Sequence, residues 1–425
     1  MTEGWSSPFL LSGHTTAKES VKCVKASLLI DGTGKAPTPD PLILIEDGLI
    51  KEVGREGEVE VPSEARIIDL GERTILPGLI DAHVHISGAR SYSPAERIIT
   101  PHDLMVIRAV EDCQKLLRAG FTTIRDCGSK VSLSLKRAIN DGVIPGPRIF
   151  AAGRAISQTG GHSDTHYLPR EEVIRQGTLL ADGPDDCRRA ARETLRDGAD
   201  LIKIMATGGV GSEKDEPYHP QFTVEEIRAI TDEAHRVGKR VAAHAQGAEG
   251  VKNAVTGGVD SIEHGYFLDS EAVKMMIEHG TFFVPTLALV KVYKRSLEKP
   301  LDMPPWRLRK QRECTDAMPK SFLMAYQAGV KIATGSDYFG APMRAHGDNA
   351  DEPITMVEHG MKSMDAIVAA TKNGAECIGV QDKVGTVNVG KVADIIGVDG
   401  NPITDMASLK RVAFIMKEGS ICLVP

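Results

Sequence analysis

Short apolar runs alternate with longer segments in which apolar residues recur every three to four positions, through most of the chain. The runs predict strands at residues 78–85, 122–126, 148–152, 201–207, 240–244, 261–264, 281–286 and 331–337. The longer segments predict helices, for example at 104–118, 186–196, 224–236, 271–279 and 366–377. Four helices end at a glycine just before the next strand, as C-terminal glycines should: Gly120, Gly198, Gly238 and Gly280. This alternation is typical of βα units around a parallel sheet.

Eight βα units with polar residues at the strand ends predict an α/β fold of the TIM type, a (β/α)8 barrel. In such a barrel the active site lies at the carboxyl ends of the strands. An open doubly wound sheet is the main alternative, but its usual GxGxxG turn after the first strand is missing here. The pattern therefore favours the barrel.

Both ends of the chain have a different pattern, with short apolar runs separated by turn residues. Near the N-terminus the expected strands are residues 24–30, 42–45 and 67–70, and near the C-terminus they are 385–387, 393–398 and 412–416. The two β-rich ends could together form one sandwich, although their spacing leaves open whether they meet.

Composition excludes several classes of protein. The chain has 425 residues, 41% of them hydrophobic and 26% charged, which is typical of a soluble globular protein. A formal net charge of -7 without any basic run argues against a nucleic-acid partner. We expect no signal peptide and no membrane span, because the N-terminus lacks a basic stretch and no apolar run is long enough. Seven isolated cysteines indicate reduced thiols and a cytoplasmic location.

Polar side chains that can bind metals end four of the predicted strands. His83 and His85 close the first strand, and because strand side chains alternate, both imidazoles point the same way. One HxH pair is weak support, but His244, His264 and Asp337 end the fifth, sixth and eighth strands in the same manner. Together they supply nitrogen and oxygen ligands that zinc and similar divalent ions accept.

Lys203 lies inside the fourth predicted strand, with aliphatic residues on both sides. A buried lysine is rarely left without a partner. It could form an inward ion pair with a carboxylate, or it could be carboxylated by CO2 and become an anionic bridge between two metals. Beside four ligands at matching strand ends, we favour the bridge.

With these residues the chain resembles the amidohydrolase superfamily, in its binuclear subtype with HxH, carboxylated Lys, His, His and Asp on strands one, four, five, six and eight. The segments 77–85 (PGLIDAHVH), 202–209 (IKIMATGG) and 262–265 (IEHG) resemble most the branch of imidazolonepropionase, the prolidase-like Xaa-Pro and Xaa-Arg dipeptidases and ochratoxinase. The resemblance implies a barrel over 76–379, a composite β-sandwich from 1–75 and 380–425, and a homo-oligomer.

The resemblance also implies a role for each ligand. Two divalent metal ions, preferably zinc, would be held by His83, His85 and Asp337 for the first and by His244 and His264 for the second. Carboxylated Lys203 and a hydroxide would bridge them. Asp337 would take the proton of the attacking hydroxide and pass it to the leaving nitrogen.

Substrate-binding candidates lie in the loops after the third, fourth and eighth strands. His162 resembles the family histidine that polarises the substrate carbonyl, and Tyr218 matches a tyrosine that binds a terminal carboxylate in dipeptidase-like relatives. Roles for His166, Arg154 and Arg344 stay open, the arginines as weaker carboxylate candidates.

Other residues of these types are interpreted as structural. Cys127 lacks a paired base, so we reject a thiol nucleophile. Histidines in predicted helices are interpreted as solvent-facing or structural: His102, His235, His279 and His359.

The predicted function is hydrolysis of the amide bond of a small-molecule dipeptide or N-acyl amino acid by a metal-activated hydroxide. Alternatives are an ochratoxin-type N-acyl phenylalanine, or a cyclic amide as in imidazolonepropionase, which lacks a lysine at the position of Lys203. A deaminase would carry a glutamate soon after His244, where Ala245 and Gln246 stand. A non-enzymatic scaffold would have lost ligands, and none is missing.

Overall fold

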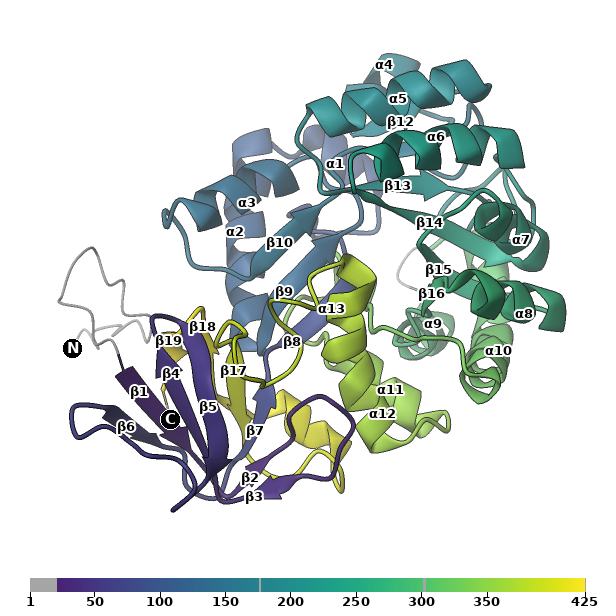
Figure 1. Cartoon of the computed structure of the whole chain (residues 1–425). Coiled ribbons are helices and arrows are strands. Elements are labelled where there is room, and N and C mark those ends of the chain that lie inside the picture. The colour runs from purple at the N-terminus through teal and green to yellow at the C-terminus, as the bar shows by residue number, and fades with distance from the viewer. Residues whose placement is uncertain (1–20, 176, 301–302, 425) are drawn as a thin grey trace.

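The computed structural model describes residues 21–175, 177–300 and 303–424. Residues 1–20 and Pro425 lie outside this part. The signal-peptide prediction and the start of the predicted segment 1–75 fall on residues 1–20. From β8 onward strands and helices alternate along the chain (Figure 1). The strands are β8 (Leu79–Val84), β9 (Phe121–Asp126), β10 (Arg148–Ala151), β11 (Ala155–Ser157), β12 (Thr178–Leu180), β13 (Leu201–Met205), β14 (Arg240–Gly247), β15 (Ser261–Phe267) and β16 (Phe282–Val284).

Helices lie between and after these strands. They are α1 (Pro94–Ile99), α2 (His102–Arg118), α3 (Ser132–Asn140), α4 (Arg170–Arg175), α5 (Pro184–Arg196), α6 (Val224–Arg236), α7 (Ala248–Thr256), α8 (Ser270–His279), α9 (Leu289–Glu298), α10 (Pro305–Ala328), α11 (Asp351–Glu358), α12 (Ser363–Ala369) and α13 (Lys372–Ile378). The α/β character predicted from the sequence is confirmed.

Parallel pairing orders these strands into two sheets, β10-β9-β8 and β12-β11-β13-β14-β15-β16. β10 and β11 follow one another across a bend at Gly153, whose φ of +65° favours glycine. The predicted third strand, 148–152, corresponds to β10, and the chain forms a further strand, β11, after the bend. Neither β11 nor β12 was expected as a separate strand.

Residues 331–338 lie between β16 and β8, although they form isolated bridges rather than the expected regular strand. Ile332 pairs with Phe283 on one side, and Tyr338 pairs with Val84 on the other. Asp337 donates its backbone N–H to the carbonyl of His83 at 2.7 Å. This segment therefore places its polar end beside the end of β8.

The expectation of one helix over 366–377 is wrong, because the chain breaks there into α12 and α13. The carbonyl of Ala369 accepts a hydrogen bond from Thr334, and that of Ala370 accepts one from Ile80. The hydroxyl of Thr371 donates back to the carbonyl of Ile367 at 2.6 Å. These carbonyls bind neighbouring strands instead of the next helical turn, so the helix restarts at Lys372.

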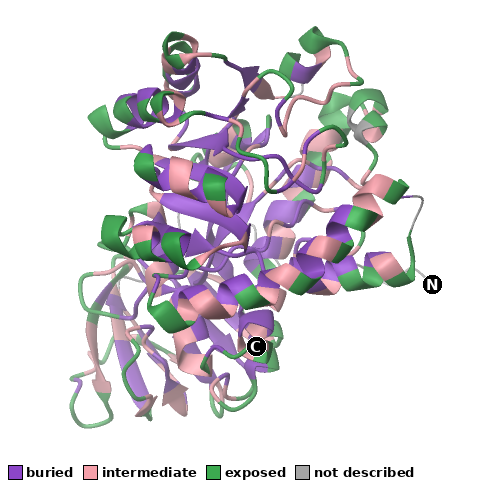
Figure 2. Ribbon diagram, turned by 90° about the vertical axis from the view of Figure 1, so that its right-hand side faces the viewer, coloured by how far each residue is buried: buried purple, intermediate pink, exposed green. Residues whose placement is uncertain are grey.

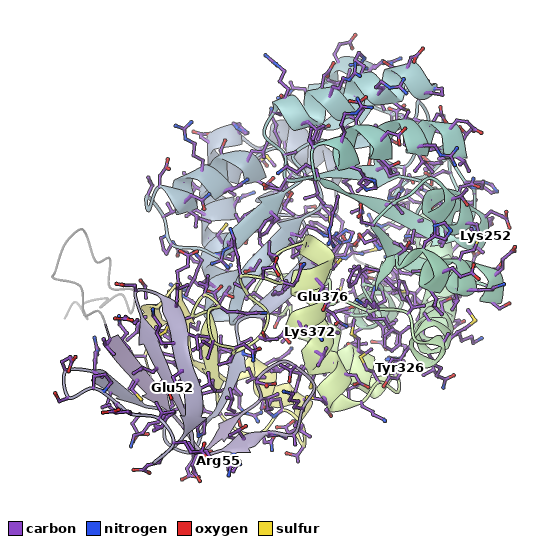
Figure 3. The ribbon with its side chains drawn as sticks, in the orientation of Figure 1. Glu52, Arg55, Lys252, Tyr326, Lys372 and Glu376 are labelled. Atoms are coloured by element: carbon purple, nitrogen blue, oxygen red, sulfur yellow. The ribbon has the colours of Figure 1, made fainter. Side chains whose placement is uncertain are left out.

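Helix α13 is tied to the start of the segment 331–338 by charged side chains. Glu376 forms an ion pair with Lys331 at 3.0 Å. It lies one helical turn after Lys372 (Figure 3). The helix therefore holds the end of the segment opposite Asp337.

Strands from both chain ends form two further sheets (Figure 1). Their order is β5-β4-β1-β6 in one and β19-β18-β17-β7-β2-β3 in the other. The strands are β1 (Val21–Lys25), β2 (Leu28–Leu29), β3 (Thr38–Pro39), β4 (Pro41–Glu46), β5 (Leu49–Arg55), β6 (Arg66–Asp69), β7 (Thr74–Pro77), β17 (Ile395–Val398), β18 (Val412–Lys417) and β19 (Ser420–Leu423), with a 3-10 helix at Met406–Lys410.

The two chain ends meet directly, because β7 pairs antiparallel with β17. Val24 and Ile43 of one sheet pack in one hydrophobic cluster with Ile395 and Phe414 of the other. The short strand expected at 385–387 does not form.

Buried residues follow the central strands, while the helices expose their outer faces (Figure 2). None of the helices in the described ranges is both long and apolar enough to cross a bilayer.

Candidate metal centre

The predicted ligands converge at the carboxyl ends of the parallel strands. Side-chain atoms of His83, His85 and Asp337 that can bind a metal lie within 4.8 Å of one another. The ring of His264 lies 5.0 Å from that of His83 and 4.5 Å from that of His244, measured between centroids. The structure therefore brings together, in one place, side chains separated by up to 254 residues along the chain.

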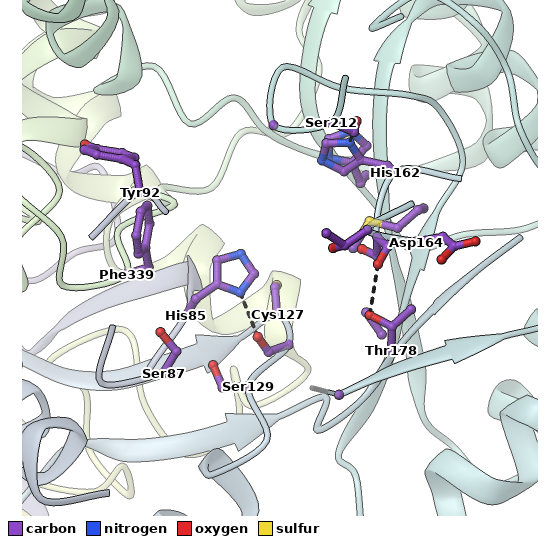
Figure 4. A pocket seen from close by; sticks show the side chains of 18 of the residues that line it. His85, Ser87, Tyr92, Cys127, Ser129, His162, Asp164, Thr178, Ser212 and Phe339 are labelled. Carbon is purple, nitrogen blue, oxygen red and sulfur yellow. Dashed lines mark hydrogen bonds between the residues drawn. The ribbon is translucent and has the colours of Figure 1, made fainter. Parts of the chain in front are cut away.

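Each imidazole uses one ring nitrogen in a contact with the protein. Nδ1 of His83 lies 2.6 Å from the carboxylate of Glu263, and Nδ1 of His85 lies 3.0 Å from the carbonyl of Gly128 (Figure 4). Nε2 of His244 contacts the carbonyl of Gly208 at 3.0 Å. These contacts orient the rings and leave the other nitrogen of each to the centre, as in metal sites of known proteins.

His264 follows the same arrangement at the end of β15. Its Nδ1 contacts the hydroxyl of Thr286 at 3.0 Å, which leaves Nε2 for the centre. His264 has a φ of +79° and Thr286 one of +50°, values that side chains other than glycine rarely adopt. Strained backbone of this kind often persists at functional sites.

Three of the histidines are neutral at ordinary pH. Burial, reinforced by neighbouring positive charges that include Lys203, lowers the pKa of His83 and His264 well below the usual value. The pKa of His244 is lowered in the same way. Neutral imidazole is the form that binds a metal ion.

Asp337 lies between the histidines and a buried arginine. Its carboxylate is 3.2 Å from Nε2 of His85, 3.7 Å from Nε2 of His83 and 3.3 Å from Nη1 of Arg344. Burial works to raise the pKa of Asp337, but the hydrogen bond with His85 and the charge of Arg344 outweigh it, so the pKa is lowered. An ionised carboxylate thus faces the Nε2 atoms of His83 and His85.

The amine of Lys203 is buried in this cluster without a hydrogen-bond partner among the described residues. Burial lowers its pKa, which favours the neutral amine that can react with CO2. The alternative of an inward ion pair with a carboxylate finds no such partner among those residues. A buried amine beside four oriented imidazoles and a carboxylate is a donor set that fits divalent metal ions.

Glu263 and Arg125 support the centre, and the sequence analysis missed both. Arg125 donates to Oε1 of Glu263 at 2.7 Å and to the carbonyl of Ala82, while Oε2 of Glu263 holds His83. Glu263 and Arg125 are both fully buried. The sequence offered a signal for both, because each is a charged residue inside an apolar strand. Arg125 lies in β9, and Glu263 lies in β15 directly before the predicted ligand His264.

His162 lies beside the centre on the loop after β11. Its ring stacks on that of His244 with centroids 4.3 Å apart. Nδ1 contacts the hydroxyl of Ser212 at 2.7 Å, and Asp215 lies 3.7 Å away. Lys310 of α10, fully buried, donates to the carbonyls of Gly209, Ser212 and Asp215 and so holds the neighbouring loop after β13.

A cavity of about 400 Å³ opens above the cluster. His162 and Ser212 lie on one side, and His85 with the packed rings of Tyr92 and Phe339 lies on the other (Figure 4). Such a volume suits a small-molecule ligand.

Two open candidates, His166 and Arg344, line this cavity, whereas Arg154 does not. Arg154 forms an ion pair with Asp197 at 2.6 Å instead. Tyr218 is also absent from the lining, because its backbone packs against Gly247 and its ring lies near Phe267, with centroids 6.2 Å apart. The prediction that Tyr218 binds substrate therefore gains no support from this geometry.

Cys127 is buried, as expected, and its thiol pKa is raised to about 12 by burial, in keeping with its rejection as a nucleophile. Among the histidines interpreted as structural, His235 pairs with Asp260 at 2.9 Å and His359 contacts the carbonyl of Thr355 at 2.9 Å. His279 is exposed, and His102 lines the cavity, which was not expected.

Several known enzymes are similar to this chain, among them an ochratoxinase, a Xaa-Pro dipeptidase and a prolidase. Ochratoxinase of Aspergillus niger is 33% identical over 438 residues, covering 97% of this chain and 88% of that enzyme. The crystal structure of a Xaa-Pro dipeptidase with bound methionine is 38% identical, with a TM-score of 0.87 over 95% of this chain and 99% of the other. A prolidase complexed with N-methylphosphonate-L-proline is 32% identical, with a TM-score of 0.89 over 96% and 100% of the two chains.

The chain also matches the amidohydrolase family over residues 74–422. This match and the three relatives confirm the predicted resemblance, including its branch. They also show that the protein is a hydrolase that acts on amide bonds. The chain belongs to the amidohydrolase family.

Proposed function

We propose that the protein is a metal-dependent hydrolase that cleaves the amide bond of dipeptides or N-acyl amino acids. The observation that carries the proposal is the set of four oriented imidazoles around the unpartnered amine of Lys203 and the carboxylate of Asp337, beneath one cavity. The substrates in the names of the similar enzymes support it, because Xaa-Pro dipeptides and ochratoxin fall within this class.

We also infer the architecture that presents this site. In our proposal the eight strands of a (β/α)8 barrel, over residues 76–379, are β8, β9, β10 together with β11, β13, β14, β15, β16 and the segment 331–338. The described residues of the predicted segments 1–75 and 380–425 would form one composite sandwich. The bridges of residues 332 and 338 to β16 and β8 support a closed barrel, and the β7–β17 pairing supports a shared sandwich.

His83, His85 and Asp337 would hold one divalent cation, and His244 and His264 would hold a second. Lys203, carboxylated by CO2, would contribute an oxygen to each. Zinc accepts nitrogen and oxygen ligands of this kind. When bound, the cations would make a water molecule acidic enough to act near neutral pH and would polarise the scissile carbonyl.

The side chains of the chain then supply positioning and proton transfer. Asp337 accepts a proton from the attacking water and gives it to the leaving nitrogen, so that the amine departs neutral. His162 donates a hydrogen bond to the carbonyl oxygen as negative charge develops there. Ser212 donates its hydroxyl hydrogen to Asp215 and therefore accepts from Nδ1 of His162, so Nε2 donates in this role when the ring carries a hydrogen on both nitrogens.

An ochratoxin-type N-acyl phenylalanine is a second candidate substrate. The 33% identity to ochratoxinase favours it, and so do Tyr92 and Phe339, whose rings pack edge to face 5.5 Å apart in the cavity wall. A cyclic amide, as in imidazolonepropionase, is less favoured because that enzyme class lacks an equivalent of Lys203.

Metal analysis combined with a release assay tests the proposal. Protein purified with zinc and bicarbonate is expected to bind about two metal ions per chain. It is expected to release free amino acids from a library of dipeptides and N-acyl amino acids, and to lose this activity on chelation. A fully metal-loaded protein that cleaves no member of the library would contradict the proposal.

A further inference from the structure

Arg344 is a buried cation in the cavity wall whose role the sequence left open. Its side chain is 8% exposed, and it lines the cavity seven residues after Asp337. Its backbone carbonyl accepts hydrogen bonds from Phe339 and Gly340, at 3.3 and 3.0 Å, and its N–H donates to Ala341 at 2.9 Å. The tight loop that follows Asp337 therefore fixes the position of Arg344.

Aromatic rings surround the guanidinium of Arg344. Its central carbon lies 5.4 Å from the ring centre of Phe339, 5.7 Å from that of Tyr293 and 5.9 Å from that of Tyr92. Figure 4 shows Tyr92 and Phe339 together in this wall. Aromatic faces stabilise a guanidinium but do not neutralise its charge.

Arg344 forms an ion pair with Asp337 at 3.3 Å, and Asp337 also faces His83 and His85. Nε of Arg344 is buried and has no hydrogen-bond partner among the described residues. Leaving a buried charged donor unpaired is costly. The wall thus holds a cation with unused hydrogen-bonding capacity, and the carboxylate of its partner Asp337 is shared with two histidines.

We propose that Arg344 binds the α-carboxylate of the leaving amino acid, an inference that rests on the function proposed above. A carboxylate fits the planar guanidinium and would supply the missing negative charge. Asp337, which would give its proton to the leaving nitrogen, is in direct contact with Arg344. In an α-amino acid the carboxylate carbon is two bonds from that nitrogen, so the carboxylate falls on the Arg344 side of the cavity.

The other two carboxylate candidates are poorly placed for this role. Neither Tyr218 nor Arg154 lines the cavity, and Arg154 is already paired with Asp197. Arg154 therefore offers a matched control for Arg344, because the same substitution removes a guanidinium from outside the cavity.

The test compares substrates that differ only in the carboxylate. N-acetyl and N-alanyl derivatives of proline and phenylalanine are assayed as free acids and as C-terminal amides, with zinc-loaded wild type, Arg344→Met and Arg154→Met. We expect wild type to prefer the acids in kcat/KM by about 10- to 100-fold, as charge-assisted hydrogen bonds predict. Arg344→Met should lose this preference, mainly through KM, and Arg154→Met should keep it.

Arg344→Lys is the second variant, in case Arg344→Met does not fold. It retains the charge without the planar fork, so we expect an intermediate preference. An equal loss on acids and amides in either Arg344 variant would overturn the proposal, since Arg344 would then act only by positioning Asp337. Equal cleavage of both forms by wild type would overturn it too. If wild type cleaves neither form of any substrate, the proposed function itself fails.

Discussion

The two sides of the cavity are built differently. The proposed metal-binding side consists of residues on or next to β8, β13, β14 and β15, whose backbones are fixed by parallel pairing, and of Asp337 on the bridged segment 331–338. The walls above these residues come from loops, with His162 on one side of the cavity and Arg344 and Tyr92 on the other (Figure 4). Ligands need fixed directions, which paired strands provide, whereas substrate contacts can change with loops without disturbing the strands.

The two sides also differ in how their side chains are held. Glu263 and Arg125, fully buried, support His83 through a charged contact in the strand layer. His162 instead depends on Asp215 and Ser212 in a neighbouring loop, which Lys310 holds by its carbonyls. Changes on the strand side should therefore reduce metal binding and stability, and changes on the loop side should lower kcat or raise KM with metal content unchanged.

Replacing Lys203 by alanine should give the largest effect. The variant would lose the bridge between the cations, which contribute several kcal/mol to catalysis, so we expect activity to fall by about a thousandfold or more. Metal content measured by mass spectrometry should fall below that of wild type. Lys136→Ala is the control, because Lys136 pairs with Asp200 away from the cavity. Full activity of Lys203→Ala would refute the binuclear centre.

His162→Asn tests the loop side. Losing one donor to a developing oxyanion costs about 10²- to 10³-fold in kcat, and we expect that loss here with metal content unchanged. Asp215→Asn should lower kcat less, because His162 remains but is less well oriented. If His162→Asn loses metal, the separation of the two sides is wrong.

Glu263→Gln tests the support behind His83. Metal affinity should weaken about 10- to 100-fold, as for other residues that orient a ligand. The free energy of unfolding should drop by about 3–5 kcal/mol, because Arg125 is left as an uncompensated buried charge. Adding Arg125→Met should recover part of the stability in a denaturant titration but not the metal affinity. Recovery of both would show that Glu263 acts only as a counter-ion.

Replacing Glu352 should give the smallest effect, a change in how the stability of the protein depends on pH. Burial raises its pKa to about 8, although its carboxylate accepts hydrogen bonds from Leu287 and Ala288. The pKa of Glu352 is higher in the folded protein than in the unfolded one. Its contribution to the free energy of unfolding is therefore fully present below the unfolded pKa and is lost as pH rises toward 8. We expect Glu352→Gln to lack this loss, so its stability relative to wild type should increase between pH 5 and 9. Parallel unfolding curves of the two proteins at all pH values would contradict this.

Several features could be predicted from the sequence because they depend on local periodicity. The helix at 224–236 was predicted with its observed ends, since Thr223 and Glu226 form a capping box at its start. The glycines at 120, 198, 238 and 280 all have positive φ, as expected for residues that end helices. The ligands at strand ends were visible because polar residues that interrupt apolar runs are conspicuous.

Other features depend on contacts between distant segments. The break between α12 and α13 arises because strand residues bind the carbonyls of Ala369 and Ala370, which no local pattern records. Tyr218 shares its loop with Asp215, yet the loop places Asp215 beside His162 and leaves Tyr218 outside the cavity.

By itself, the sequence determined the α/β organisation, the family and the set of side chains that meet at the candidate metal centre. Strand periodicity fixes which side chains share a face, and the parallel arrangement fixes which ends meet. Only the tertiary structure decided which buried charges support those ligands and which arginine faces the cavity. Glu263, Arg125 and Arg344 acquire their roles from neighbours more than 100 residues away or from the turn of a loop, and neither is encoded in a local pattern.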